Sequence, residues 1–216
     1  MPSRLHKIYR RLRYGQPIIV VSGLPRSGTS MAMKMLEAGG LPLLIDGVRT
    51  ADEDNPKGYF EFERVKDMAS EQEWSWLDDL RGKGVKIISY LLKELPTNHN
   101  YKVLLMRRDL QEILASQSKM LDRRGESSAT EDQRMVELFE SDLWKTNYLL
   151  KHNPQFESLE LHYRDVLTNP LEQAQRIRDF LEVDMPVEQM AQVVDPDLYR
   201  NRAEALAARG RSPAGC

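Results

Sequence analysis

The most constraining feature of the sequence is an apolar run that leads into a glycine-containing loop and then a helix. Residues 17–22 read Pro-Ile-Ile-Val-Val-Ser and lie between Gly15 and Gly23. A short, β-branched apolar run of this kind is typical of a strand buried in a parallel sheet. The loop 23–30 follows directly, and Thr29–Ala38 carries a helical pattern that stops at two glycines. The order strand, loop, helix predicts an α/β fold.

The rest of the chain continues this alternation. Further strands are expected at 41–45, 85–89, 101–106 and 156–162, and further helices at 110–120, 131–150 and 171–181. Alternating elements imply a parallel sheet with helices on both faces. We therefore expect a P-loop-type, three-layer α/β/α fold with a central parallel sheet of about five strands. Ligands bind such sheets beyond the carboxyl ends of the strands, and the expected loops 46–58 and 122–132 are long enough to cover a site there.

Size and composition predict one α/β domain, residues 15–216, after a basic amino-terminal segment, residues 1–14. The net charge of −2 argues against bulk nucleic-acid binding. The single cysteine, Cys216, excludes an internal disulfide framework and a cysteine-rich zinc site. No apolar run approaches the roughly 18–20 residues that span a bilayer, and the start of the chain lacks the apolar core of a signal peptide. The expectation is a cytoplasmic, metal-independent domain.

The segment Arg4–Tyr14 departs from this average. Its basic residues are Arg4, Lys7, Arg10, Arg11 and Arg13, and its apolar residues at helical spacing are Leu5, Ile8, Tyr9 and Leu12. A basic amphipathic helix can lie on an anionic membrane, which would make residues 4–14 a peripheral membrane contact. The alternative is a solvated helix that packs its apolar stripe against the domain, and we expect this more ordinary arrangement.

The loop 23–30 has the features of an anion-binding site. It reads Gly-Leu-Pro-Arg-Ser-Gly-Thr-Ser, with glycines five residues apart that let the backbone wrap an anion at a helix amino terminus. The frame is that of the nucleotide-phosphate loop G-x-x-x-x-G-K-[ST], but Thr29 occupies the lysine position. The cation of the loop is instead Arg26, whose planar fork can hold a terminal anionic group.

Residues 25–30 resemble the 5′-phosphosulfate loop of the sulfotransferase superfamily, in which Lys or Arg precedes Ser/Thr-Gly-Thr. The resemblance implies a sulfuryl donor, 3′-phosphoadenosine 5′-phosphosulfate (PAPS), which becomes adenosine 3′,5′-bisphosphate and requires no metal. It also implies which residues bind the donor here: Pro25, Arg26, Ser27, Gly28, Thr29 and Ser30. This donor has no γ-phosphate, which suits a loop without the usual lysine.

A second anion site is expected after the strand 101–106. Arg108 follows this strand, and Ser116 comes eight residues later, two turns into the next helix. An arginine fork and a hydroxyl at this spacing can converge on one phosphate. The pair resembles the 3′-phosphate motif of the family. Arg107 is one residue out of register and would point to the other side of the strand.

A third segment, residues 161–170, reads Leu-His-Tyr-Arg-Asp-Val-Leu-Thr-Asn-Pro. It resembles the Tyr-Glu-Asp-Leu segment of the family, whose tyrosine lies near the nucleotide, and this nominates Tyr163. Arg164 stands where the family usually has glutamate. The alternative for Tyr163 is a core tyrosine with a satisfied hydroxyl.

Sulfuryl transfer runs by in-line attack, with catalysis by positioning and by neutralisation of charge. Arg26 is the first candidate for neutralising that charge. Lys86 resembles a lysine that precedes the catalytic histidine of cytosolic sulfotransferases, but Ile88 occupies the histidine position. The acceptor still needs a general base. In the protein-tyrosine and heparan-sulfate branches this is a glutamate after the second strand, and the nearest positional match is Asp46. We expect four nearby carboxylates to be solvated surface groups and not the general base: Glu53, Asp54, Glu61 and Glu63.

The expected function is transfer of a sulfuryl group from PAPS to a hydroxyl or amine on a small-molecule, carbohydrate, lipid or peptide acceptor. Two alternatives stay open. One is a P-loop nucleotide kinase or hydrolase, which Thr29 in the lysine position counts against. The other is a catalytically inert nucleotide-binding module of the same fold, which Ile88 in the histidine position favours.

Overall fold

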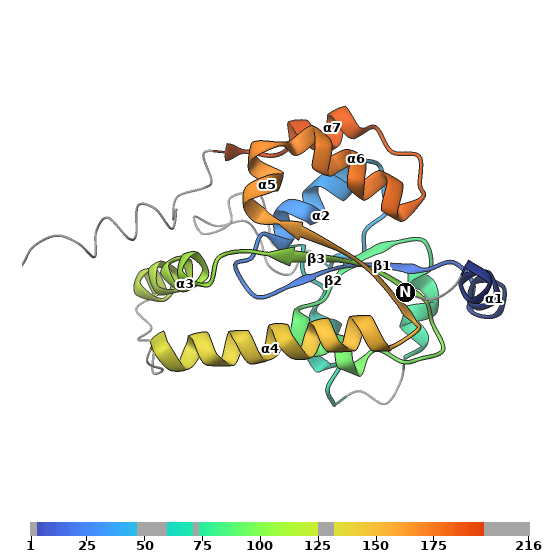
Figure 1. Ribbon diagram of the computed structural model, residues 1–216, viewed down its shortest axis with the longest axis horizontal. Helices are drawn as coiled ribbons and strands as arrows, with labels where there is room; N and C mark the ends of the chain where they lie inside the picture. Colours follow the sequence, from blue (N-terminus) through green and yellow to red (C-terminus); the bar gives the residue numbers. More distant parts are fainter. Residues whose placement is uncertain (1–3, 47–59, 71–73, 125–131, 197–216) are drawn as a thin grey trace, which may run out of the picture.

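A central parallel sheet organises the protein. The computed structural model describes residues 4–46, 60–70, 74–124 and 132–196 (Figure 1). In these residues four strands pair side by side in the order β2-β1-β3-β4. Their bounds are β1 Ile18–Gly23, β2 Gly84–Lys86, β3 Tyr101–Arg107 and β4 Phe156–His162. The predicted parallel α/β sheet is confirmed.

The expected strand at 41–45 is reduced to one bridge at the edge of this sheet. Leu43 pairs in parallel with Gly84 of β2, and the Gly84 amide donates to the Pro42 carbonyl over 2.8 Å. Pro42 has no N–H to continue a ladder, and β2 itself is only three residues long. The sheet therefore has four strands in the described residues, where about five were expected.

Helices cover both faces of the sheet, which confirms the three layers (Figure 1). One face carries α2 (Thr29–Ala38), α5 (Tyr163–Thr168), α6 (Pro170–Leu181) and α7 (Val187–Gln192). The other carries α4 (Asp132–His152) and three 3₁₀ helices, η1 (Glu63–Asp67), η2 (Ser75–Leu80) and η3 (Ser89–Glu94). The alternation of β1 follows these layers, because Ile19 and Val21 pack toward α2 and Ile18 and Val20 toward η2 and η3.

The helix α3 (Leu110–Arg124) leaves the carboxyl end of β3 and packs against α4 through Ile113 and Leu143. It runs four residues beyond its expected end at residue 120. The expected covering loop 46–58 lies outside the described residues except for Asp46. Of the expected loop 122–132, residues 122–124 belong to α3 and Asp132 to α4, and the rest lie outside the described residues. Glu53 and Asp54 lie outside them as well.

The helix α1 (Arg4–Tyr14) lies at the other end of the sheet from α3, beside the amino ends of the strands (Figure 1). The expectation that its apolar stripe packs against the domain is wrong. Leu5 and Leu12 are 80% and 83% exposed. The helix contacts the domain through its polar side, because Arg10 donates hydrogen bonds to the loop that precedes β3.

Candidate active site

The loop after β1 is shaped by two glycines that tolerate no side chain. At Gly23 (φ +150°) an added Cβ would lie 2.6 Å from the Met106 carbonyl oxygen and 2.5 Å from Ser27 Oγ. At Gly28 (φ +102°) it would lie 2.5 Å from Cδ2 of Tyr163. Glycine alone combines these backbone angles with such close contacts. The predicted loop thus follows β1 and packs against β3 and the start of α5.

The interior of the loop carries polar groups that an anion would satisfy. No side chain caps the first turn of α2, whose N-cap residue is Gly28 in the left-handed conformation. Ser27 is 1% exposed, and its Oγ has no hydrogen-bond partner in the described part of the chain. Buried hydroxyls and helix amino termini normally find partners. A bound phosphate or sulfate would supply acceptors for both. Of the other predicted loop residues, Thr29 is buried, Ser30 half-buried and Pro25 exposed.

The loop and the expected second anion site adjoin each other. Nε of Arg26 donates a hydrogen bond to Oγ of Ser116 over 3.0 Å. Nη1 of Arg108 donates to the backbone oxygen of Arg26 over 3.2 Å. They meet because β1 and β3 are parallel neighbours, with Gly23 paired to Met106, so that both chains leave the sheet at the same edge. Three predicted donor-binding residues therefore form one hydrogen-bonded group.

Arg108 is held by two further side chains. Its Nε donates to Oε2 of Glu112 over 3.0 Å, and both side chains are almost fully buried. Its guanidinium lies over the Tyr163 ring, 4.3 Å from the centroid. Burial raises the pKa of the Tyr163 hydroxyl, although the positive charge of Arg108 acts in the opposite direction. Tyr163 thus packs as a neutral side chain between Gly28 and Arg108.

The sequence did not single out Glu112. The one available signal was its spacing of four residues from Arg108, which suits an ion pair on a helix. Such pairs are common on exposed helix faces, and the burial that distinguishes this one comes from the packing of α3 against the loop.

The other expected catalytic residues lie around β2. Lys86 ends this strand, level with Val21, and its Nζ is 3.4 Å from Oε1 of Glu61. Both side chains are largely buried. Asp46 is exposed, and its carboxylate accepts a hydrogen bond from the backbone N–H of Glu63. Among the carboxylates named from the sequence, Glu61 is one that the structure places in contact with Lys86.

The described residues contain no cluster of three or more His, Cys, Asp and Glu side chains suited to a metal ion. None of their helices combines the length and apolar character needed to cross a membrane.

The fold and the site define a parallel α/β protein in which Arg26, after β1, and Arg108, after β3, lie beside each other. The family model described as sulfotransferase domain matches residues 16–199. The chain therefore belongs to the sulfotransferase family. A search of curated proteins found no matching sequence.

Solved sulfotransferase structures are also similar to this chain. Mouse sulfotransferase SULT7A1 complexed with PAP shares 13% identity, covering 92% of this chain and 67% of that one, with a TM-score of 0.51. At this identity the likeness concerns the fold alone. A sulfotransferase domain from the curacin biosynthetic pathway shares 18% identity over 88% of this chain and 82% of that one, with a TM-score of 0.49. A sulfotransferase from Alicyclobacillus acidocaldarius shares 12% over 90% and 91%, with a TM-score of 0.48.

Proposed function

We propose that this protein transfers a sulfuryl group from PAPS to a hydroxyl or amine acceptor. The observation that carries the proposal is the hydrogen-bonded group of Arg26, Arg108 and Ser116. PAPS bears anionic groups at both its 3′ and 5′ positions, and two adjoining cationic anchors suit such a nucleotide. Membership of the sulfotransferase family supports the reaction. The description of SULT7A1 as complexed with PAP supports this nucleotide type.

In this proposal the loop binds the 5′-phosphosulfate. The uncapped start of α2 supplies backbone N–H groups, and the buried Ser27 hydroxyl supplies a further donor. Pro25, Gly28, Thr29 and Ser30 complete the loop. The positive charge of Arg26 neutralises charge on the transferred group in the transition state.

Arg108 and Ser116 would bind the 3′-phosphate. Ser116 Oγ currently accepts a hydrogen bond from Arg26. An incoming phosphate would accept a hydrogen bond from the Ser116 hydroxyl and attract the Arg108 guanidinium, and Arg26 could then exchange its bond to Ser116 for one to the sulfuryl group. Binding of the 3′-phosphate and positioning of Arg26 would then be coupled through one hydroxyl.

For the general base we propose two carboxylates. Asp46 follows from the sequence, and Glu61 is favoured by its 3.4 Å contact with Lys86 at the carboxyl end of β2. Lys86 would stabilise charge at the reacting centre beside this carboxylate. Asp46→Asn and Glu61→Gln are compared in the same assay. The substitution that removes the general base should abolish turnover and leave donor affinity unchanged. Full turnover in both variants would exclude both residues as the base.

Titration calorimetry in EDTA tests the donor site. We expect adenosine 3′,5′-bisphosphate to bind without metal and at least about tenfold more tightly than 5′-AMP, because a charge-assisted contact is worth roughly 1.5–3 kcal/mol. Arg108→Ala should abolish that preference. Arg107→Ala is the matched control, because Arg107 is the neighbouring arginine, at the end of β3. Equal affinity for the two nucleotides, or binding of ATP only with magnesium, would instead support a kinase or hydrolase.

Radiolabelled PAPS tests the reaction itself. Transfer of label to any member of a panel of sugar, lipid, peptide and small aromatic acceptors would exclude an inert binding module. Tight binding of adenosine 3′,5′-bisphosphate together with no transfer to any acceptor would favour that module.

A further inference from the structure

The helix α1 presents its apolar side to solvent. Four large apolar side chains share this side and are 51–83% exposed: Leu5, Ile8, Tyr9 and Leu12. An amphipathic helix on a globular domain normally turns such a stripe toward the core. The orientation of α1 is the reverse, so the stripe contributes nothing to the core of the domain.

Specific polar contacts hold α1 in this orientation. Nε of Arg10 donates to Oδ1 of Asn100 over 2.9 Å, and its Nη2 donates to the carbonyl oxygens of Thr97 and His99 over 3.0 and 2.6 Å. The Asn100 side chain donates in return to the backbone oxygens of Arg10 and Gly15 over 3.0 and 3.1 Å. The helix is therefore joined to the domain at both its middle and its end.

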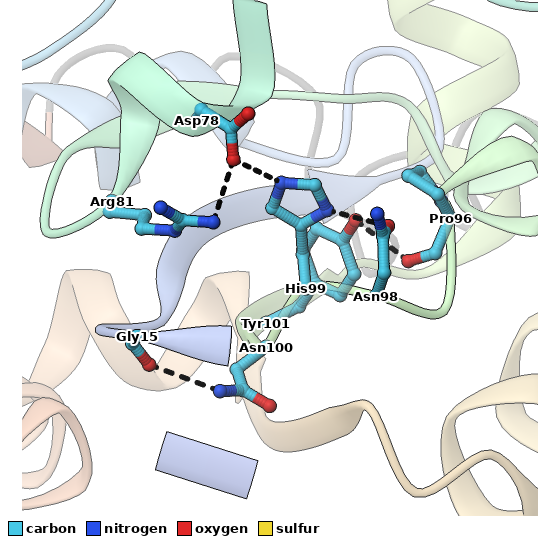
Figure 2. Close-up of polar contacts among 8 residues, drawn as sticks. All are labelled: Gly15, Asp78, Arg81, Pro96, Asn98, His99, Asn100 and Tyr101. Carbon is cyan, nitrogen blue, oxygen red and sulfur yellow. Dashed lines mark hydrogen bonds and ion pairs between the residues drawn. The ribbon is translucent and has the colours of Figure 1, made fainter. Parts of the chain in front are cut away.

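The loop that receives Arg10 is itself anchored (Figure 2). The buried His99 ring contacts Asp78 through Nε2 and Asn98 through Nδ1, over 3.1 and 2.9 Å. The Tyr101 hydroxyl donates to the Pro96 carbonyl over 3.0 Å. Because both α1 and its receiving loop are held by hydrogen bonds, the outward apolar stripe is a fixed feature of the fold.

The charges of α1 indicate what covers this stripe. The helix carries five basic residues and no acidic one, although the whole chain has a net charge of −2. Arg11 and Arg13 are exposed. We propose that α1 binds an anionic lipid surface, with the apolar stripe at the acyl boundary and the arginines at the headgroups.

A lipid surface fits these observations better than a second copy of the chain. Pairing two α1 helices through their stripes would bring their basic side chains together, with no acidic residue on either helix to offset the repulsion. A stable protein interface also covers roughly 800 Å² on each partner. Four side chains on one helix of 11 residues do not reach that area by themselves. A bilayer complements both the stripe and the charges.

The test uses the full chain and sedimentation with vesicles. The protein should bind vesicles of phosphatidylcholine with phosphatidylserine, and should not bind vesicles of phosphatidylcholine alone. Each basic side chain near the anionic surface should raise the partition coefficient about fivefold through the surface potential. High salt should weaken the binding because it screens that potential. The double variant Leu5→Gln/Leu12→Gln should lower the partition coefficient at least about tenfold. Arg11→Gln/Arg13→Gln should lower it by a similar factor.

Matched controls separate these effects from general changes in surface composition. Leu138→Gln/Leu171→Gln removes two leucines that are about half exposed on other helices, and Lys93→Gln/Lys151→Gln removes two exposed charges. Both controls should bind vesicles as the unchanged protein does. Every variant should keep its affinity for adenosine 3′,5′-bisphosphate, since α1 lies at the end of the sheet opposite the loop.

Three outcomes would overturn the proposal. One is that the unchanged protein sediments equally with both kinds of vesicle or with neither. Another is that the α1 variants bind as well as the controls. The third is that light scattering reveals a dimer that Leu5→Gln/Leu12→Gln converts to a monomer, which would assign the stripe to a second copy. All of these results are independent of whether the protein transfers sulfuryl groups.

Discussion

Gly28 offers a direct test of how the loop is built. The substitution Gly28→Ala adds one methyl group at a residue with φ +102°, where alanine is strained by about 1–2 kcal/mol. The new Cβ would also lie 2.5 Å from Cδ2 and 3.0 Å from Cε2 of Tyr163. These distances are well inside the optimal carbon–carbon separation of roughly 3.5–4.0 Å. Tyr163 is buried, so the ring cannot move aside without disturbing its neighbours, which adds about 1–3 kcal/mol.

Gly40 provides the matched control for this substitution. It also has a positive φ, +80°, but an added Cβ would meet no atom within 4 Å. Gly40→Ala should therefore lower the free energy of unfolding only by the cost of the strained backbone, about 1–2 kcal/mol. Urea unfolding monitored by circular dichroism should show that Gly28→Ala loses about 1–3 kcal/mol more than Gly40→Ala.

The double variant Gly28→Ala/Tyr163→Leu locates the contact responsible. A smaller side chain at 163 removes the ring atoms that the alanine would strike, so the two substitutions should be less destabilising together than the sum of their separate effects. Equal losses for Gly28→Ala and Gly40→Ala, or strict additivity in the double variant, would refute the packing of Gly28 against Tyr163.

Two further predictions concern buried charges. Glu112→Gln should lower the free energy of unfolding by about 1–3 kcal/mol, because it leaves the buried Arg108 without its counter-charge. The same variant should bind adenosine 3′,5′-bisphosphate at least as tightly as the unchanged protein in calorimetry, because a carboxylate that repels phosphate is gone. Unchanged stability would contradict the importance of the ion pair. Burial lowers the pKa of His99 below its usual value of 6.5 although Asp78 opposes this, so the unfolded chain takes up a proton first as the pH falls. Urea unfolding should accordingly show the protein losing stability below pH 6.5 more steeply than His99→Gln, and parallel profiles for the two proteins would count against a buried, neutral His99.

The elements that could be predicted from the sequence are those that local pattern determines. The β-branched run of β1 and the helical spacing of α2 fix both elements and the loop between them. Parallel strands leave a sheet at one edge, so the meeting of Arg108 and Ser116 with this loop also followed from the order of elements. The strand expected at 41–45 was predicted too long, because the prediction rested on apolar character and did not take into account that Pro42 has no N–H to donate.

The features that the sequence did not reveal depend on contacts between distant residues. Helical periodicity shows which side chains of α1 share a face, but not which face meets the domain. That choice depends on Arg10 and Asn100, which are 90 residues apart. The same holds for the contact of Glu61 with Lys86, which lies 25 residues further along the chain. A single sequence carries no signal for either contact.

Arg26 combines a strained backbone conformation with a proposed catalytic role, and two substitutions at this residue can separate these properties. Its φ of +68° is a conformation that glycine adopts freely and that costs another residue about 1 kcal/mol. The hydrogen bond from its side chain to Ser116 stabilises the fold by about the same amount as this strain costs. Stability alone therefore gives arginine no clear advantage over glycine at this position. Arg26→Gly and Arg26→Ala both remove the guanidinium, but only glycine relieves the backbone. Urea unfolding should therefore find Arg26→Gly more stable than Arg26→Ala by about 1 kcal/mol. Sulfuryl transfer should fall at least about a hundredfold in both variants, because the charge on the transferred group is no longer neutralised. Retained transfer in Arg26→Gly would show that the arginine does not act on that group, and equal stability of the two variants would show that its backbone is not strained.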